Sequence, residues 1–208
     1  MGNAVDDDGA RSASARRYVM DDDLTARLET VLMVVAETLE FPTVRVNVVD
    51  DDRQHTIRLF GTGGTGSVPR SEAFCDTVVR TGHPVIVQDA AHDPRFADFP
   101  AVRSGEIGSY LGVPLVGRED LVIGAICTVD STHRTITSHQ LRVLLQFGKI
   151  VERQLDLIRT ATEEHLAVGA AAGAGRQGGA PSRPLVGLVG GARRPRPGHR
   201  FGRPHRTP

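Results

Sequence analysis

The two cysteines carry the most reactive side chains in this sequence. Cys75 lies where a short helix is expected to begin, and a helix N-terminus lowers the pKa of a thiol, which suits a redox-sensing residue. The alternative is a small buried hydrophobic residue, as free cysteines often are. Cys127 stands in an apolar run and is expected in the core. Neither belongs to a CxxC motif or has a histidine pair at ligand spacing, so the sequence predicts no zinc site and no disulfide framework.

Other polar candidates lie between positions 89 and 110. Asp89, Asp93 and Arg95 are placed where they would meet a polar ligand, but an Asp in such a turn also accepts hydrogen bonds from nearby N–H groups. Tyr110 either offers its hydroxyl group to a pocket or lies in the core with a hydrogen-bond partner. The sequence contains no Ser-His-Asp set of plausible placement and no paired carboxylates in an apolar frame. We therefore expect no catalytic activity.

Composition divides the 208 residues into three parts. Residues 1–19 are polar and are expected to be disordered, residues 20–166 form one domain, and residues 167–208 are an Arg-, Gly- and Pro-rich tail that is also expected to be disordered. The net charge of zero hides an asymmetry, because the last 41 residues contain 8 Arg and no acidic residue. No apolar run approaches the roughly 20 residues of a membrane span, and we expect a cytoplasmic protein with no membrane partner.

Hydrophobic periodicity predicts mixed helices and strands within the domain. A stripe of apolar residues at spacings of 3 and 4 predicts a helix from about Asp21 to Leu39. Two glycine-bounded apolar runs, residues 109–116 and 122–129, predict a hairpin at the centre of a sheet. Additional strands are expected at 43–50, 55–60 and 84–87, with a short helix over 70–79. Along residues 43–50, Val alternates with Arg45 and Asn47, which indicates a half-exposed strand.

The last predicted helix begins at Thr137, which forms a T-x-x-Q capping box with Gln140. One stripe of this helix keeps a 3-4-3-4-3 spacing typical of a heptad seam that packs on a second helix. We predict that this stripe is the interface of a homodimer. Its residues are Leu141, Leu144, Gly148, Val151, Leu155 and Ile158.

The glycine-rich stretch from Gly61 to Pro69 is expected to be a loop. A phosphate-binding P-loop needs Lys and Ser or Thr after the last glycine, and a dinucleotide fingerprint needs a helix opening directly there. Neither feature is present, so the stretch does not predict a nucleotide site.

The order of several short motifs resembles that of a GAF domain. These motifs are Phe74-Cys75-Asp76, the stretches 81–89 and 93–96, the hairpin from Ser109 to Asp130, and the closing helix. The resemblance covers residues 22–160 and implies an α+β, PAS-related fold: an antiparallel sheet with the N- and C-terminal helices on one face and a roofed ligand pocket on the other. The pocket candidates are Phe74, Cys75, Asp89, Asp93, Arg95, Phe96, Tyr110 and Cys127.

Specialised members of the family carry signatures that this sequence lacks. Bilin-binding members attach the chromophore through a cysteine beside a histidine, but Cys75 precedes Asp76 and Cys127 precedes Thr128. Members that reduce free methionine sulfoxide use clustered cysteines in the pocket loop, and residues 97–108 contain none. The NKxnFxxxDE signature of cyclic-nucleotide binders is absent. Haem binders need a histidine in the pocket, for which only His83 and His92 are roughly placed. The resemblance thus leaves the cofactor unknown.

Three functions follow from these observations. The favoured one is a non-catalytic sensory or regulatory module that binds an unidentified small molecule, or mediates dimerisation, and acts on a signalling partner protein. The second is a small thiol-based redox enzyme or sensor that uses Cys75, similar to methionine sulfoxide reductases of this fold. The third, in which nucleic acid binds the arginines of the tail such as Arg193, Arg194 and Arg196, is disfavoured.

Overall fold

A single antiparallel sheet organises the chain in the computed structural model, which describes residues 4–19 and 27–174. The chain divides into residues 1–169 and 170–208, and all contacts below lie within the first unit. The strands follow the order β3-β2-β1-β6-β5-β4. The strands are β1 (Thr43–Val49), β2 (Arg53–Phe60), β3 (Ser67–Pro69), β4 (Val85–Val87), β5 (Ser109–Val116) and β6 (Val122–Asp130), and the helices are α1 (Ala4–Arg16), α3 (Arg27–Leu39), α4 (Phe74–Thr81), α5 (Pro100–Arg103) and α6 (Ser138–Ala174).

The predicted central hairpin is confirmed. β6 lies between β1 and β5, and every residue of β6 from Ile123 to Asp130 is buried. At Gly124 a Cβ atom would lie 1.9 Å from the backbone oxygen of Asn47, so only glycine allows this approach of β1. Buried residues form two separate hydrophobic clusters around the sheet.

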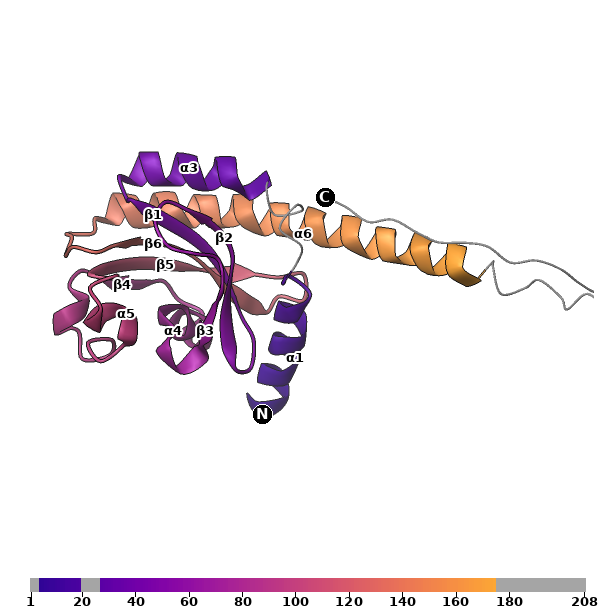
Figure 1. The fold of residues 1–208 in the computed structure, drawn as a ribbon, viewed down its shortest axis with the longest axis horizontal. Coiled ribbons are helices and arrows are strands. Elements are labelled where there is room, and N and C mark those ends of the chain that lie inside the picture. Colours follow the sequence, from indigo (N-terminus) through magenta and orange to yellow (C-terminus); the bar gives the residue numbers. More distant parts are fainter. Residues whose placement is uncertain (1–3, 20–26, 175–208) are drawn as a thin grey trace, which may run out of the picture. The chain divides into compact units, whose positions relative to one another are not determined.

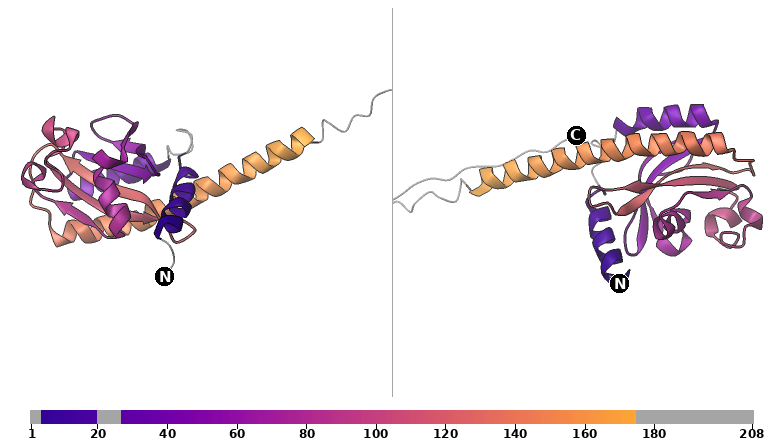
Figure 2. Two further views of the ribbon diagram at one scale, coloured as in Figure 1. Left: turned by 90° about the horizontal axis from the view of Figure 1, so that it is seen from below. Right: turned by 180° about the vertical axis from the view of Figure 1, so that it is seen from behind.

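Helices cover the two faces of the sheet unequally, as predicted (Figure 1). α3 and α6 lie together on one face, whereas α4 and α5 lie on the other (Figures 1 and 2). The α3–α6 side is an aliphatic core that includes Leu28, Leu32, Val46, Ile126 and Leu144. The α4 side holds a second cluster with aromatic residues and both cysteines. The fold is thus the predicted α+β arrangement.

Local sequence patterns predicted most boundaries of the helices and strands correctly. The capping box at the start of α6 is present: Gln140 N donates to Thr137 Oγ1 at 3.2 Å, and Thr137 N donates to Gln140 Oε1 at 2.9 Å. The predicted helix over 70–79 divides into a 3-10 turn, Arg70–Glu72, and α4. Part of the predicted loop at 61–69 is instead β3, because Ser67–Pro69 pairs with residues 53–55 of β2. The Asp21–Asp23 start expected for the first core helix lies outside the described residues.

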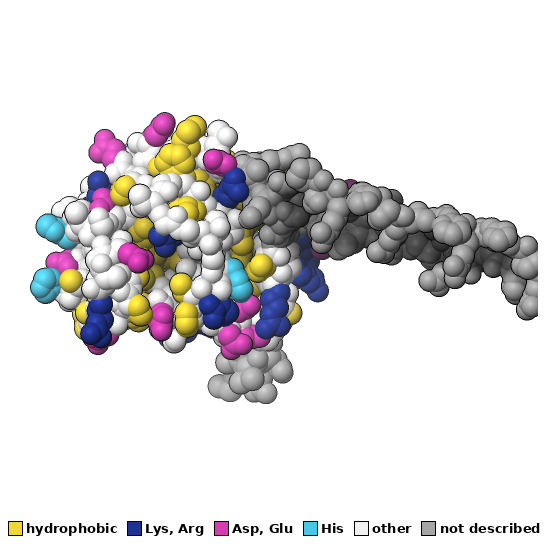
Figure 3. Space-filling view, viewed as in Figure 1, with side chains coloured by type: hydrophobic (Ala, Val, Ile, Leu, Met, Phe, Trp, Pro, Cys, Tyr) yellow, Lys and Arg dark blue, Asp and Glu magenta, His cyan; other side chains and the backbone are white. Residues whose placement is uncertain are grey.

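The predicted dimer seam is wrong as an interface, because most of it packs inside the chain. Leu144, Val151 and Leu155 are at most 1% exposed and belong to the aliphatic core. Gly148 is also buried, Ile158 is 5% exposed, and only Leu141 is partly exposed. A 3-4 spacing suits packing on a sheet as well as on a second helix. In the described part of α3 and α6, the large apolar residues that are exposed are Met33, Val34, Ile150 and Leu157. Figure 3 shows hydrophobic side chains on the side where α3 lies.

The N-terminal segment is not disordered where the structure describes it. Residues 4–16 form α1, and Ala15 and Tyr18 are completely buried. Arg11 is 7% exposed and donates to the backbone oxygens of Val49 at 2.5 Å and of Asp50 at 3.3 Å. Because these contacts reach residues far along the chain, the polar local sequence gave no sign of them. The expected tail from residue 167 begins within α6, which continues to Ala174, and residues 175–208 lie outside the described part.

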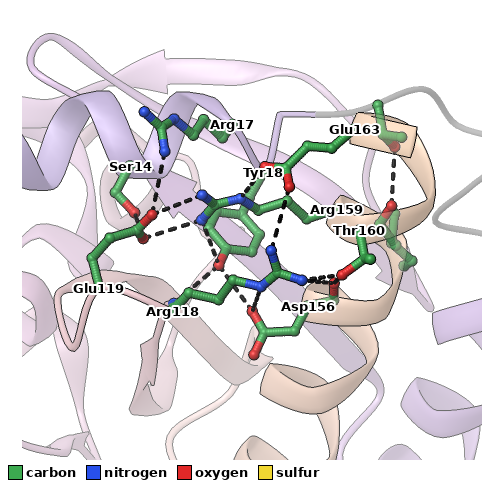
Figure 4. A network of polar contacts seen from close by, with 11 residues as sticks. Ser14, Arg17, Tyr18, Arg118, Glu119, Asp156, Arg159, Thr160 and Glu163 are labelled. Carbon is green, nitrogen blue, oxygen red and sulfur yellow. Dashed lines mark hydrogen bonds and ion pairs between the residues drawn. The ribbon is translucent and has the colours of Figure 1, made fainter. Parts of the chain in front are cut away.

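A polar network fastens α1 to the hairpin turn and to α6 (Figure 4). Arg159 on α6 binds both carboxylate oxygens of Glu119 in the turn, at 2.7 and 3.1 Å. Ser14 Oγ of α1 donates to the same carboxylate at 2.6 Å, and Arg159 also donates to the hydroxyl group of Tyr18 at 3.2 Å. The hydrogen bonds from Arg159 and Ser14 lower the pKa of Glu119 to about 2. Three distant segments therefore meet at one ion pair.

Replacing Glu119 with Gln tests this network through pH. The pKa of Glu119 is lower in the folded chain than in the unfolded chain. Its contribution to the free energy of unfolding is therefore complete above the ordinary pKa of 4.5 and is lost as pH falls toward 2. We expect Glu119→Gln to lower the free energy of unfolding by about 1 kcal/mol at pH 7, since the carboxylate is partly exposed to screening solvent. Thermal melts from pH 7 to pH 3 should show the difference shrinking.

Glu163→Gln is the matched control. Glu163 also pairs with Arg159, at 2.9 Å, but from a more exposed position, and it does not touch α1. Glu163→Gln should lower the free energy of unfolding by less than Glu119→Gln does at every pH. Equal effects of the two substitutions would show that Glu119 does not hold the segments together.

Candidate functional site

A cavity of about 270 Å³ lies on the α4 side of the sheet. Its floor is formed by β1, β2, β5 and β6, and its walls by the 63–66 loop, β3, the start of α4 and residues 101–107. This volume is slightly below the range of ligand pockets, which begins at about 300 Å³, so it suits only a small metabolite. The site is therefore built on central strands, with connecting segments around its edge.

Four of the pocket candidates line this cavity: Phe74, Cys75, Tyr110 and Cys127. Each is at most 4% exposed. Phe74 stacks on Tyr110 with ring centroids 5.0 Å apart, which holds the start of α4 against β5. Tyr110 has space for its ring because residue 112 is glycine, where a Cβ atom would lie 2.1 Å from the tyrosine oxygen. These residues form the sulfur-containing part of the cavity floor.

The other four candidates do not line the cavity. Phe96 is buried behind it and stacks on Phe74 with centroids 4.4 Å apart. Asp93 binds Arg95 at 2.7 Å, and Asp89 binds the exposed His92 at 2.9 Å. These charges therefore stabilise a surface segment, which is the turn-stabilising role that the sequence left open. Of the two histidines considered for haem, neither lines the cavity.

Polar residues of β1 and β2 line the cavity, although the sequence did not identify them as pocket candidates. Arg45, Asn47, Gln54 and Thr56 all line the cavity, and Asn47 is only 1% exposed. The alternation of β1 is as predicted, but its polar face was expected to meet solvent and instead faces the cavity. The alternating pattern was the available signal. It cannot distinguish a solvent-facing polar side from one that is covered by a later part of the chain.

Asn47 is the central hydrogen-bonding residue of the site. Its Nδ2 atom donates to Cys75 Sγ at 3.2 Å and to Cys127 Sγ at 3.4 Å. Its Oδ1 atom accepts a hydrogen bond from Thr56 Oγ1 at 2.8 Å. Both ends of the amide are therefore satisfied inside the protein, as a buried amide requires.

Arg45 and Gln54 are less well satisfied. The Nε atom of Arg45 and the Oε1 atom of Gln54 are buried, and neither has a hydrogen-bond partner among the described residues. Burying such groups without partners costs free energy. Glu72 and Glu106 also line the cavity, but neither forms an ion pair with Arg45 in the described part of the chain. Two residues that line the cavity thus each contain a buried polar atom without a hydrogen-bond partner in the described part of the chain.

The two thiols differ in acidity because they interact. A hydrogen bond from Cys127, and others from Tyr110 and Asn47, lower the pKa of Cys75 in spite of its burial. The same interaction with Cys75, together with burial, raises the pKa of Cys127. Burial raises the pKa of Tyr110, which remains protonated and able to donate to Cys75 Sγ, 3.3 Å away. Cys75 is therefore the more acidic and more nucleophilic of the pair.

Among the described residues, no group of three or more His, Cys, Asp or Glu side chains is arranged to hold a metal ion. Within the same residues, no helix combines the length and apolar character needed to cross a membrane.

The structure is that of an α+β domain with a six-stranded antiparallel sheet and a cavity on one face of it. The sequence profile of the GAF domain matches residues 23–155. That range is well over half of the chain. This chain belongs to the GAF domain family.

Two curated proteins are similar in sequence. A cyclic di-GMP phosphodiesterase from Pseudomonas aeruginosa is 28% identical over 135 residues, which cover 64% of this chain and 23% of that protein. A Nif-specific regulatory protein from Herbaspirillum seropedicae is 24% identical over 155 residues, which cover 68% of this chain and 28% of that protein. The chain thus spans about a quarter of the length of these relatives.

Solved structures share the fold at low sequence identity. The GAF domain of an Acinetobacter phosphoenolpyruvate-protein phosphotransferase is 21% identical with a TM-score of 0.54, covering 73% of this chain and 93% of that one. A free methionine-R-sulfoxide reductase from Neisseria meningitidis, solved with its substrate, is 19% identical with a TM-score of 0.56, covering 73% and 89%. The likeness establishes the fold.

Replacing Arg45 with Met tests whether this residue serves binding or folding. A half-buried cation without a partner destabilises the fold, so the Arg45→Met variant should be as stable as the wild type or up to ~1 kcal/mol more stable. Asn47→Leu is the comparison, because it removes a fully bonded amide and should cost about 1–3 kcal/mol. Chemical denaturation of both variants measures this. A loss above about 2 kcal/mol in Arg45→Met would assign Arg45 a structural role.

Proposed function

We propose that this chain is a non-catalytic sensory or regulatory GAF module that binds a small molecule in the cavity above β1 and β6. The observation that carries the proposal is a pair of buried polar atoms, Arg45 Nε and Gln54 Oε1, which belong to residues that line the cavity and find no hydrogen-bond partner in the described part of the chain. A site whose polar groups find no partner in the protein is suited to a ligand that supplies them. Arg45 favours an anionic group, and Gln54 Oε1 favours a hydrogen-bond donor.

The sheet offers a route by which binding would be transmitted. Along β6, Cys127 and Val129 border the cavity, while Ile126 points to the opposite face. There a Cβ atom at Gly148 of α6 would meet Val113 and Ile126 at 3.4 and 3.7 Å, so the helix lies close to the strands. A shift of β6 on ligand binding would therefore act on α6, which would present the change to a signalling partner.

The relatives support a regulatory role and limit the proposal. One is a Nif-specific regulatory protein, and the match to it covers 68% of this chain. The match to the cyclic di-GMP phosphodiesterase covers 23% of that protein, so its hydrolytic activity is not part of the proposal. A homodimer remains a prediction and needs residues other than the buried seam. Light scattering at high concentration decides whether the chain pairs.

The thiol-based enzyme remains the alternative. Cys75 is in the cavity and has a lowered pKa, which is what a nucleophilic thiol requires. Reduction of a sulfoxide substrate that stops in a Cys75→Ala variant would favour this alternative over a sensor. The arginines proposed for nucleic-acid binding lie outside the described residues.

Filling the cavity tests the ligand-binding proposal. Ala101 lines the cavity, and the Ala101→Phe variant should fold but exclude the ligand. Melting temperatures are measured for each protein with a panel of small organic acids, amino acids and nucleotides. We expect one class of compound to raise the melting temperature of the wild type and to leave that of Ala101→Phe unchanged. At a hundredfold excess over Kd, the ligand should add about 2.7 kcal/mol to the free energy of unfolding of the wild type.

Ala161→Phe is the matched control. Ala161 is exposed on α6, away from the cavity, so this variant should respond to the ligand like the wild type. An equal response in Ala101→Phe would place the binding site elsewhere. No response from the wild type to any class would count against the proposal.

A further inference from the structure

The two cysteines come from distant parts of the chain and meet at one nitrogen atom. Cys75 belongs to the first turn of α4, and Cys127 belongs to the central strand β6. Asn47 Nδ2 lies 3.2 Å from one sulfur and 3.4 Å from the other, so the sulfurs are close neighbours. They are the only cysteines of the 208-residue sequence.

Both cysteines line the cavity, although each is only 1% exposed to solvent. A small solute that enters the cavity therefore meets both thiols at the same place. The surroundings also favour reaction at Cys75. Tyr110 OH and Asn47 Nδ2 are positioned to donate to a Cys75 thiolate, and the positive charge of Arg45 is nearby.

We propose that Cys75 and Cys127 form a reversible disulfide when a small hydroperoxide enters the cavity. The Cys75 sulfur attacks the peroxide, an S–O bond forms as the O–O bond breaks, and the thiol proton leaves with the departing oxygen as water or an alcohol. The Cys127 sulfur then attacks the Cys75 sulfenic acid, so that an S–S bond forms as the S–O bond breaks and the Cys127 proton leaves with the hydroxide as water. Two thiols are oxidised and one peroxide is reduced.

The disulfide would alter the cavity. A disulfide holds its sulfurs about 2.05 Å apart, so the start of α4 and β6 must approach each other. Asn47 would then lose its two thiol acceptors, and the Tyr110 hydroxyl group would lose Cys75. Because the same residues line the cavity, oxidation would change its floor. This site goes beyond the proposed function, since it requires the two thiols and a peroxide and no bound ligand.

The test is a count of free thiols in the full-length protein. The reduced protein is treated with one equivalent of hydrogen peroxide, quenched with catalase, unfolded and alkylated with iodoacetamide. We expect the number of alkylated cysteines to fall from two to none and to return to two after dithiothreitol. Proteolysis without reduction should give a linked pair of peptides containing Cys75 and Cys127. Two alkylated cysteines, or a bond between two chains on a non-reducing gel, would overturn the proposal.

Single variants test the order of the steps. Cys127→Ala removes the resolving thiol, so peroxide should leave a Cys75 sulfenic acid that dimedone traps. In Cys75→Ala, Cys127 should remain alkylatable at the same peroxide concentration. Trapping of Cys127 in place of Cys75 would contradict the assigned roles. If circular dichroism shows that either variant is unfolded, the peptide map of the oxidised wild type decides alone.

Discussion

The alternation of side chains along β1 is the constraint on which this structure depends. Val44, Val46 and Val48 enter the aliphatic core shared with α3 and α6, while Arg45 and Asn47 enter the cavity on the opposite face. Both faces of this strand are covered, so the Asn47 side chain and the Nε atom of Arg45 do not have bulk water as a partner. Each must find a partner within the protein or in a bound molecule, or the fold loses stability.

Asn47 and Arg45 meet this requirement differently. Asn47 is bonded to Thr56 and to the two thiols, and it thereby joins β1, β2, α4 and β6. Arg45 has no such partner for its Nε atom among the described residues. Asn47 therefore helps to determine the shape of the cavity, whereas the proposed function assigns Arg45 to a ligand. In that proposal, structural and binding roles are divided between two residues of one strand.

Physical reasons explain what the sequence could and could not predict. The hairpin and the capping box of α6 depend on nearby residues, and both were predicted from local patterns. The contacts of α1 and Tyr18 with the rest of the domain include bonds from Arg11 to Val49 and from Tyr18 to Asp156. These partners lie more than 30 residues away, so the polar local sequence was interpreted as disorder. The heptad-like stripe of α6 is real, but its spacing is shared by helix–helix and helix–sheet packing.

The residues of the cavity, too, could be predicted only in part from local sequence patterns. Phe74, Cys75, Tyr110 and Cys127 were expected at the pocket, and all four line it, whereas Asp89, Asp93 and Arg95 pair at the surface. Position along the chain could not separate these groups, because charged turn residues occur both at pocket rims and at ordinary turns. Burial of the polar face of β1 depends on how α4 and the 63–66 loop close over it.

Native mass spectrometry of the freshly purified protein, compared with its denatured spectrum, tests most directly whether the cavity is a ligand site. A small molecule that satisfies Arg45 and Gln54 should appear as one added mass per chain under native conditions and vanish on denaturation. The same added mass should be absent from a protein whose cavity is filled. A wild-type protein that remains bare when purified, and that stays bare after incubation with the organic-acid, amino-acid and nucleotide panel, would contradict the central claim.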